Sequence, residues 1–281
     1  MNPSTWRLIE DGPEDGRLNM AIDRAILTAC DNGQAPATLR LYGWDKPTLT
    51  IGYSQNEFKD IDRTQCERKN IPIVRRFTGG RALLHQHELT YSLIAPIPHC
   101  QFPGNLAGAF GAVSKAVIDS LEKLGVPQLE IAGKDKKGKR RKRSPACFST
   151  ANHWEIMAKG KKLAGSAQRR LNGAFLQHGS ILLDWDPELA HSLLHYSSEA
   201  EKVQGLKSLV SGTFTLSDVL PGKPKWGEVA SYFVEGFQNT FSGFWQSKGL
   251  SLLEKEMVKE YLEASVPILS MKDKSQLIDS K

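Results

Sequence analysis

The sequence of 281 residues has only four cysteines, widely separated and without a Cys-x-x-Cys pair. Such a set predicts neither a structural zinc site nor a disulfide framework. No run of about 18 apolar residues occurs, and no basic stretch followed by an apolar segment opens the chain. We therefore expect a cytoplasmic protein without a membrane-spanning segment.

Two phosphate-binding patterns, the Walker loop and the Gly-x-Gly-x-x-Gly fingerprint, are also missing, and no internal repeat stands out. The composition is 40% hydrophobic and 24% charged, with 24 glycines and 14 prolines scattered along the chain. These values exclude fibrous, collagenous and wholly disordered classes. At roughly 150 residues per domain, the chain is long enough for one large domain or two small ones.

The net charge of +6 comes from one segment. Residues 134–143, KDKKGKRRKR, contain eight basic residues and one acidic residue, which leaves the rest of the chain close to −1. A solvated loop, a surface for an acidic protein and a nucleic-acid contact all fit such a run, in that order of preference. We do not expect a nucleic-acid partner.

Apolar spacing predicts helices and strands that alternate irregularly, without long strand–helix–strand repeats. This pattern favours an α+β fold with a mainly antiparallel or mixed sheet. We expect 38–42 and 48–53 to form a hairpin, 73–76 and 82–95 to pair across a glycine turn, and 154–158, 161–167 and 174–183 to form a meander. Another strand is expected at 6–9 and a short one at 129–131. Helices are expected at 17–30, 60–68, 106–124, 187–195, 226–242 and 253–264.

The first candidate site is the glycine turn that follows Arg75 and Arg76. Gly79 and Gly80 allow the backbone to approach a ligand closely, and neighbouring arginines suit a phosphate or carboxylate. An ordinary β-turn with solvated arginines explains the same pattern.

Histidines form a second group of candidates. His85 and His87 would point to the same side of a continuous strand, but no third metal ligand is evident. We therefore expect no metal site, and we expect His178 to be structural.

The third candidate is Cys147, because it follows the basic segment and precedes a strand that carries Lys162. Positive surroundings lower the pKa of a thiol and favour the nucleophilic thiolate. Most cysteines are small buried apolar residues, and that is what we expect of Cys30, Cys66 and Cys100.

Four blocks together carry a resemblance that none carries alone. RRFTGGRALLH (75–85), ELTYS (88–92), KLAGSAQ (162–168) and QHGSILL (177–183) resemble, in this order, the biotin and lipoate protein ligase family of acyl transferases. The resemblance covers roughly residues 5–190. It implies a catalytic domain at residues 1–200, built on a mixed or antiparallel sheet with flanking helices, and a helical C-terminal extension at 201–281 packed on it.

The segment PACF (145–148) is similar to the branch of octanoyltransferases that act on octanoyl-acyl carrier protein, because it places a cysteine before the lysine strand. The basic run before Cys147 is heavier than the family pattern. The resemblance implies transfer of octanoate to a lysine of the glycine cleavage H protein or another lipoyl domain, through a cysteine thioester. No cofactor is implied beyond the phosphopantetheine that carries the donor. The implied catalytic residues are Cys147 and Lys162, and the implied substrate-binding residues are Arg76, Gly79, Gly80, His85, Gly165 and Ser166.

Three alternatives remain open. An ATP-dependent lipoate or octanoate ligase would use the glycine turn and Lys162 around an acyl-adenylate without needing Cys147. An amidotransferase between lipoyl domains would share the cysteine chemistry but take a different donor. A nucleic-acid binder would depend only on the basic run and would bind with steep salt dependence.

Overall fold

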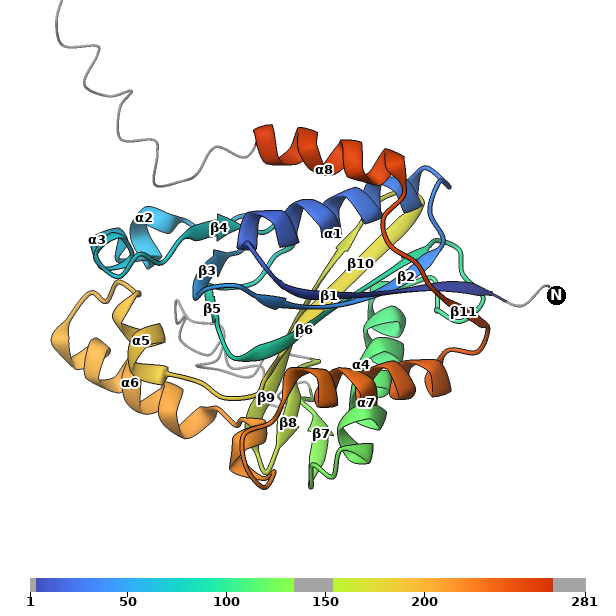
Figure 1. The fold of residues 1–281 in the computed structure, drawn as a ribbon. Coiled ribbons are helices and arrows are strands. Elements are labelled where there is room, and N and C mark those ends of the chain that lie inside the picture. The colour runs from blue at the N-terminus through green and yellow to red at the C-terminus, as the bar shows by residue number, and fades with distance from the viewer. Residues whose placement is uncertain (1–3, 134–153, 265–281) are drawn as a thin grey trace, which may run out of the picture.

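The computed structural model describes residues 4–133 and 154–264. A long twisted sheet crosses the molecule, with helices α1 and α8 on one face and α4 and α7 on the other (Figure 1). A smaller sheet with short helices lies at one end. This arrangement confirms the predicted α+β class with a mixed sheet.

Within the described residues, eight strands form the large sheet, in the order β11-β1-β2-β6-β10-β9-β8-β7. β1 pairs in parallel with both β2 and β11, and the other neighbours are antiparallel. The predicted meander of β8, β9 and β10 is confirmed. The strands are β1 (Thr5–Glu14), β2 (Ala37–Trp44), β6 (Glu88–Pro96), β7 (Leu129–Ile131), β8 (Ile156–Ala158), β9 (Lys161–Arg170), β10 (Ala174–Leu182) and β11 (Phe244–Ser247).

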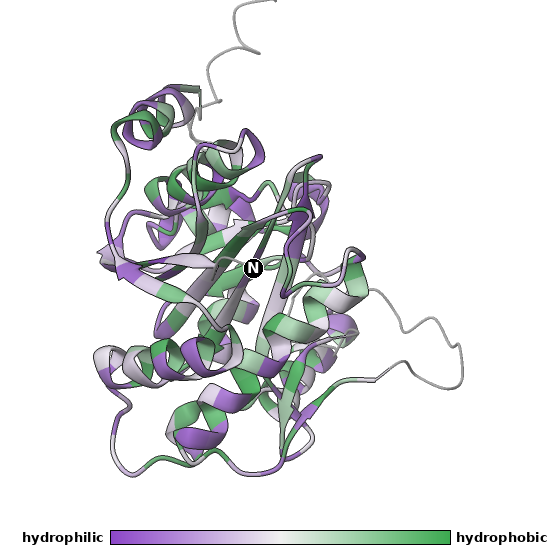
Figure 2. Ribbon diagram, turned by 90° about the vertical axis from the view of Figure 1, so that its right-hand side faces the viewer, coloured by the Kyte–Doolittle hydropathy of each residue, from purple (hydrophilic) through white to green (hydrophobic). Residues whose placement is uncertain are grey.

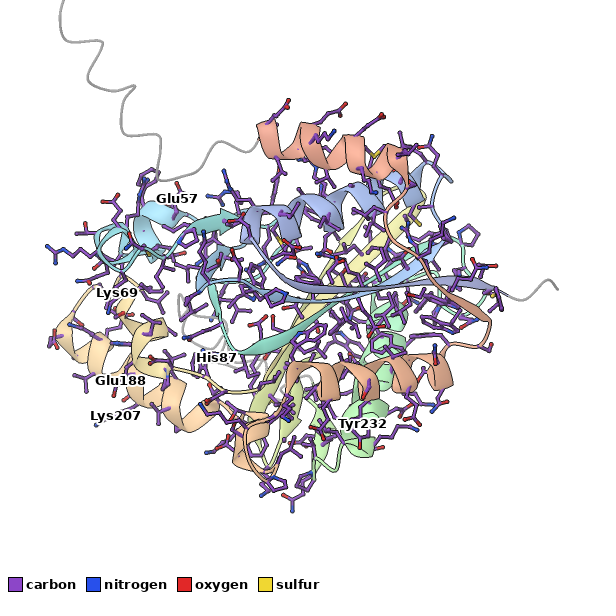
Figure 3. All side chains as sticks on the ribbon, viewed as in Figure 1. Glu57, Lys69, His87, Glu188, Lys207 and Tyr232 are labelled. Carbon is purple, nitrogen blue, oxygen red and sulfur yellow. The ribbon has the colours of Figure 1, made fainter. Side chains whose placement is uncertain are left out.

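The small sheet has the order β4-β3-β5, with β3 (Thr48–Ile51) parallel to β4 (Ile73–Arg75) and antiparallel to β5 (Leu83–His85). Its apolar side packs with residues of the helices α3, α5 and α6 around a separate core, and the short helix α2 lies nearby in the chain. Charged side chains such as Lys69, Glu188 and Lys207 lie on the outside of this end (Figure 3). The helices are α2 (Glu57–Asp60), α3 (Arg63–Arg68), α5 (Pro187–Ser192) and α6 (Glu199–Gly212).

The remaining helices are α1 (Gly16–Asp31), α4 (Leu106–Lys123), α7 (Trp226–Thr240) and α8 (Leu252–Ala264), with a 3-10 turn at Leu216–Asp218. Side chains fix where two of them begin: Asp15 accepts from the amides of Arg17 and Leu18, and Asn105 accepts from that of Gly108. Across residues 4–133 and 154–264, no helix combines the length and the apolar character needed to span a membrane.

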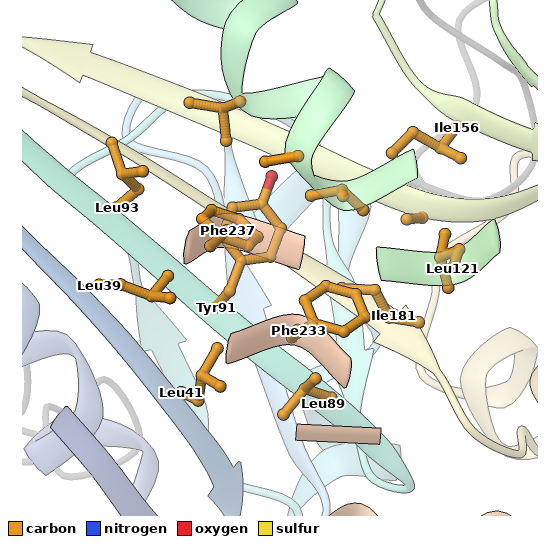
Figure 4. Close-up of a cluster of buried hydrophobic side chains, with 14 of the residues drawn as sticks. Leu39, Leu41, Leu89, Tyr91, Leu93, Leu121, Ile156, Ile181, Phe233 and Phe237 are labelled. Atoms are coloured by element: carbon orange, nitrogen blue, oxygen red, sulfur yellow. The ribbon is translucent and has the colours of Figure 1, made fainter. Parts of the chain in front are cut away.

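The main core lies between the large sheet and the helix pair α4 and α7. Leu121, Phe233 and Phe237 from these helices meet Tyr91 and other strand residues, and all four side chains are almost fully buried (Figure 4). Hydrophobic and hydrophilic residues alternate in bands along the helices (Figure 2), as expected of helices that each bury one face.

The predicted pairings around residues 38–95 are wrong. β2 and β3 do not form a hairpin, because β2 pairs with β1 and β6 while β3 pairs with β4 and β5. The stretch 82–95 is not one strand: β5 ends at His85 and a new strand, β6, begins at Glu88 in the other sheet. Four consecutive polar residues, HQHE at 85–88, interrupt the apolar pattern at the point where the chain changes sheet.

Two elements were not predicted. Leu209 is the one buried residue of helix α6, so this helix lacks a clear apolar stripe. Strand β11 is short and mostly exposed. Together with α7 and α8 these elements make up most of residues 201–264, where β11 joins the large sheet beside β1. The domain division at residue 200 stays a prediction.

A buried ion pair attaches α8 to the sheet. The guanidinium of Arg7 on β1 donates two hydrogen bonds, of 2.7 and 2.6 Å, to the carboxylate of Glu254. Both side chains are almost fully buried. Glu254 also accepts from the amide of Ser251 at the start of the helix. Burial by itself would raise the pKa of Glu254, but these donors outweigh it and lower that pKa.

We predict that Glu254→Ala lowers the free energy of unfolding by roughly 3–5 kcal/mol, because it leaves the Arg7 guanidinium buried without its partner. Urea unfolding near neutral pH measures this, with the exposed Glu256→Ala as control. Since the folded-state pKa is lowered, the pair's stabilisation is present above the ordinary glutamate pKa and disappears as the pH falls through the folded-state value. A loss no larger than that of Glu256→Ala would contradict the prediction.

Candidate active site

A pocket opens where the small sheet meets the middle of the large sheet. Its enclosed volume is about 90 Å³, and the space between its walls, including the open mouth, is about 630 Å³. Its walls come from α1, β2, the glycine turn, β5, β6, β9 and β10. Five of the predicted site residues line it: Arg76, Gly80, His85, Gly165 and Ser166.

Strand register explains why separate sequence blocks meet here. Ser180 on β10 is paired with Gly165 on one side and Thr90 on the other. These positions place small or hydroxyl side chains on one patch of the sheet. Gly179, next to Ser180, has no room for a side chain, since a Cβ there would lie 2.6 Å from the hydroxyl of Ser166.

The glycine turn forms one edge of the pocket, and a buried arginine side chain hydrogen-bonds to its backbone. The guanidinium of buried Arg76 donates to the carbonyl oxygens of Gly79, at 3.2 Å, and Arg81, at 3.0 Å. Gly80 has a φ of +102°, a conformation that side chains rarely adopt. Opposite the turn, a Cβ on Gly52 would lie 2.1 Å from the carbonyl oxygen of Gly80. Arg76 therefore shapes the turn.

His85 lies in the wall of the pocket with its ring stacked on that of Trp44, the centroids 3.9 Å apart. Its Nε2 lies 2.7 Å from the hydroxyl of Thr50, and its Nδ1 lies 2.7 Å from the carboxylate of Glu88. Burial lowers the pKa of His85 despite the opposing charge of Glu88, so the ring is neutral. The substrate-binding role predicted for His85 is untested.

The expectation that His85 and His87 share a face is wrong. β5 ends at His85, and His87 lies in the turn that follows, where it is exposed. Among residues 4–133 and 154–264, no group of three or more His, Cys, Asp or Glu side chains is arranged to hold a metal ion.

His178 forms a second buried contact below the glycine turn. Its Nε2 lies 2.7 Å from the hydroxyl of Thr78, and its Nδ1 lies 3.4 Å from the carboxylate of Asp23. Asp23 is fully buried and also accepts from Arg40 and Tyr42. Burial would raise the pKa of Asp23, but His178, Arg40 and Ser92 outweigh burial and lower it, so it is a carboxylate.

Lys162 is almost fully buried on β9, and its ammonium donates to the carboxylate of Glu155. Glu155 in turn lines the pocket. The predicted catalytic lysine is thus connected to the pocket through an acidic residue that the sequence did not single out.

Cys147 lies outside the described residues, in the segment 134–153. Cys30 and Cys66 are buried, as expected, and burial raises the pKa of each thiol to about 12. Cys100 is exposed, which corrects the expectation that it is buried, because it lies in a surface turn after β6.

Several residues that complete the site were missed by sequence reasoning. Asp23 and Asn19 lie one turn apart on the inner face of α1, among its apolar residues. Polar residues on an otherwise apolar helix face are unusual, so the sequence alone already marks Asp23 and Asn19 as candidates. Nothing in the local sequence marks Thr50, Thr78 or Glu155.

The two glycines of the turn provide a matched test of its backbone. Gly80→Ala is expected to lower the free energy of unfolding by about 1 kcal/mol or more, because φ is positive and the new Cβ would lie 3.0 Å from the Arg76 guanidinium. Gly79→Ala, whose Cβ meets nothing within 4 Å, is expected to be close to neutral. Urea unfolding of both variants checks this, and equal losses would contradict it.

Similar proteins confirm the resemblance drawn from the sequence. The model of the lipoyl protein ligase A/B catalytic domain matches residues 15–238. Octanoyltransferase LipM of Kyrpidia tusciae is 37% identical over 262 residues, 92% of this chain and 95% of that protein. Octanoyltransferase LipM of Bacillus subtilis is 33% identical over 269 residues, 94% and 96% of the two chains.

Solved structures show the same fold. A bi-partite lipoate protein ligase from Thermoplasma acidophilum gives a TM-score of 0.75 at 22% identity, over 94% of this chain and 93% of that one. A lipoate-protein ligase A bound with ATP gives the same score and identity, over 94% and 95%. From the family match and the full-length relatives together, we conclude that the chain belongs to the lipoyl protein ligase A/B catalytic-domain family.

Proposed function

We propose that this chain is a protein octanoyltransferase that moves octanoate from acyl carrier protein to a lysine of a lipoyl domain, such as the glycine cleavage H protein. The observation that carries the proposal is the meeting of four sequence blocks at one pocket, in a chain whose relatives over nearly its whole length are named octanoyltransferases. A cytoplasmic location is part of the proposal.

The first half-reaction forms an acyl-enzyme. The Cys147 thiolate attacks the carbonyl carbon of the octanoyl thioester, a new carbon–sulfur bond forms, and the bond to the pantetheine sulfur breaks. The departing pantetheine thiolate takes up the proton that the Cys147 thiol lost on ionising. The positive charge of Lys162 favours the thiolate form of Cys147, and Glu155 holds that ammonium at the edge of the pocket.

The second half-reaction transfers the acyl group. The neutral amine of the acceptor lysine attacks the thioester carbonyl, a carbon–nitrogen bond forms, and the carbon–sulfur bond to Cys147 breaks. The proton lost by the amine returns to the sulfur. In both steps negative charge develops on the carbonyl oxygen, and we assign its stabilisation to Lys162 and to backbone amides near Lys162 or near Gly79 and Gly80.

This cycle needs no nucleotide, because thioester exchange is nearly balanced and conversion of a thioester into an amide is downhill. We therefore propose that no cofactor takes part beyond the phosphopantetheine of the donor. The basic run 134–143 lies close to Cys147 in the sequence, which suits an acidic carrier protein as donor.

We predict that Cys147→Ala abolishes octanoyl transfer and the octanoyl adduct seen by intact mass after mixing with octanoyl-acyl carrier protein. Cys100→Ala is the matched control, because Cys100 is exposed and still expected to be dispensable. Cys30 and Cys66, with pKa values raised to about 12, are poor nucleophiles at neutral pH. If Cys147→Ala retained transfer only in the presence of ATP, the ligase alternative would replace this proposal.

Lys162→Ala is expected to slow formation of the adduct by on the order of 100-fold, the effect of removing one preorganised charge. Alkylation of Cys147 by iodoacetamide should shift to higher pH in the same variant, because the thiolate loses its neighbouring cation. Lys161→Ala removes an exposed lysine one position away and should change neither measurement. An unchanged alkylation profile in Lys162→Ala would contradict the prediction, because it would mean that Lys162 does not lie near the thiol of Cys147.

A further inference from the structure

We propose that two hydrogen-bond relays hold the glycine turn, and that His85 and His178 are their central members, each with a proton on Nδ1 and an acceptor at Nε2. One relay is Thr50–His85–Glu88 and the other is Thr78–His178–Asp23. Both histidines are positioning residues that act through the turn. The kinetic part of this inference rests on the proposed octanoyl transfer, whereas its structural part does not.

The first relay has a fixed direction. Arg76 can only donate, and its Nη1 donates to the hydroxyl oxygen of Thr50. The single proton of that hydroxyl has two acceptors within reach, Nε2 of His85 at 2.7 Å and the carbonyl oxygen of Leu83 at 3.5 Å, and we assign it to the shorter contact with His85. The Nδ1 proton of His85 points to Glu88, also at 2.7 Å. Glu88 is a carboxylate, because the donors around it lower its pKa although burial would raise it.

The second relay repeats this order of groups. Asp23 accepts only, so Nδ1 of His178 carries the proton directed at it. We assign Nε2 as the acceptor, to which the hydroxyl of Thr78 donates across 2.7 Å. Thr78 belongs to the turn itself, and its carbonyl oxygen accepts from the amide of Tyr53.

The relays end at two points of the same turn. The first reaches it through Arg76, whose guanidinium binds the carbonyl oxygens of Gly79 and Arg81. The second reaches it through Thr78. Because both ring nitrogens of each histidine face protein groups, the rings present carbon edges and faces to the pocket. A proton-shuttle role is therefore not assigned to His85.

The first test needs no substrate. In ¹⁵N-labelled wild-type protein at pH 7.5, nitrogen–proton correlation spectra should show both rings protonated at Nδ1 and unprotonated at Nε2. His85→Gln and His178→Gln assign the signals. An Nε2-protonated tautomer or a doubly protonated ring at either position would overturn the relay on that side.

The second test separates positioning from folding. Thr78→Val should lower kcat by on the order of 10- to 100-fold, because the turn loses its anchor, with KM for the octanoyl donor within about twofold. Thr78→Ser, which keeps the hydroxyl, should recover most of kcat. Thr38→Val is the matched control: Thr38 is equally buried, but its hydroxyl binds Arg7 at the other end of β2.

Equal kcat values for Thr78→Val and Thr38→Val would overturn the positioning role. If Thr78→Val does not fold, the tautomers of the wild-type protein still test the relays, and the kcat of Thr78→Ser still tests the role of the hydroxyl. A wild-type protein without octanoyl transfer would refute the proposed function, and the tautomer result would remain valid.

Discussion

The buried carboxylate of Asp23 is the interaction on which the rest of the site depends. It accepts hydrogen bonds from Arg40 and Tyr42 on β2, from Ser92 on β6, and it faces His178 on β10. One side chain of helix α1 thus connects the helix to three neighbouring strands directly below the pocket. An unpaired charge buried this deeply would cost much free energy. Helix α1 and the three strands therefore have to be correctly aligned before the carboxylate has all its hydrogen-bond donors.

The position of the pocket follows from the change of sheet between His85 and Glu88. The chain leaves the small sheet and enters the large one within three residues, so the ends of β5 and β6 remain side by side. The glycine turn, which precedes β5, is thereby brought over the middle of β10 and β9. The lining of the pocket therefore combines residues from two sheets.

Sequence reasoning predicted the elements with strong apolar periodicity, such as α1 and α4, and the meander of β8, β9 and β10. It failed where pairing depends on distant partners: β3 pairs with β4 and β5 rather than with β2, because the choice between two sheets is made by tertiary packing. The motif glycines and Lys162 were singled out because they stand in short contiguous blocks that resemble a known family. Glu155 and the threonines of the relays could not, since their significance appears only when strands far apart in the sequence are brought together.

The ion pair between Arg7 and Glu254 has a consequence for synthesis of the chain. Its partners are 247 residues apart, so at roughly 5–20 residues per second the arginine is made about 10 to 50 s before its carboxylate. Strand β11, which completes the edge beside β1, is also made late. During that interval the edge of β1 that pairs with β11 is open, and the Arg7 guanidinium lacks its carboxylate partner.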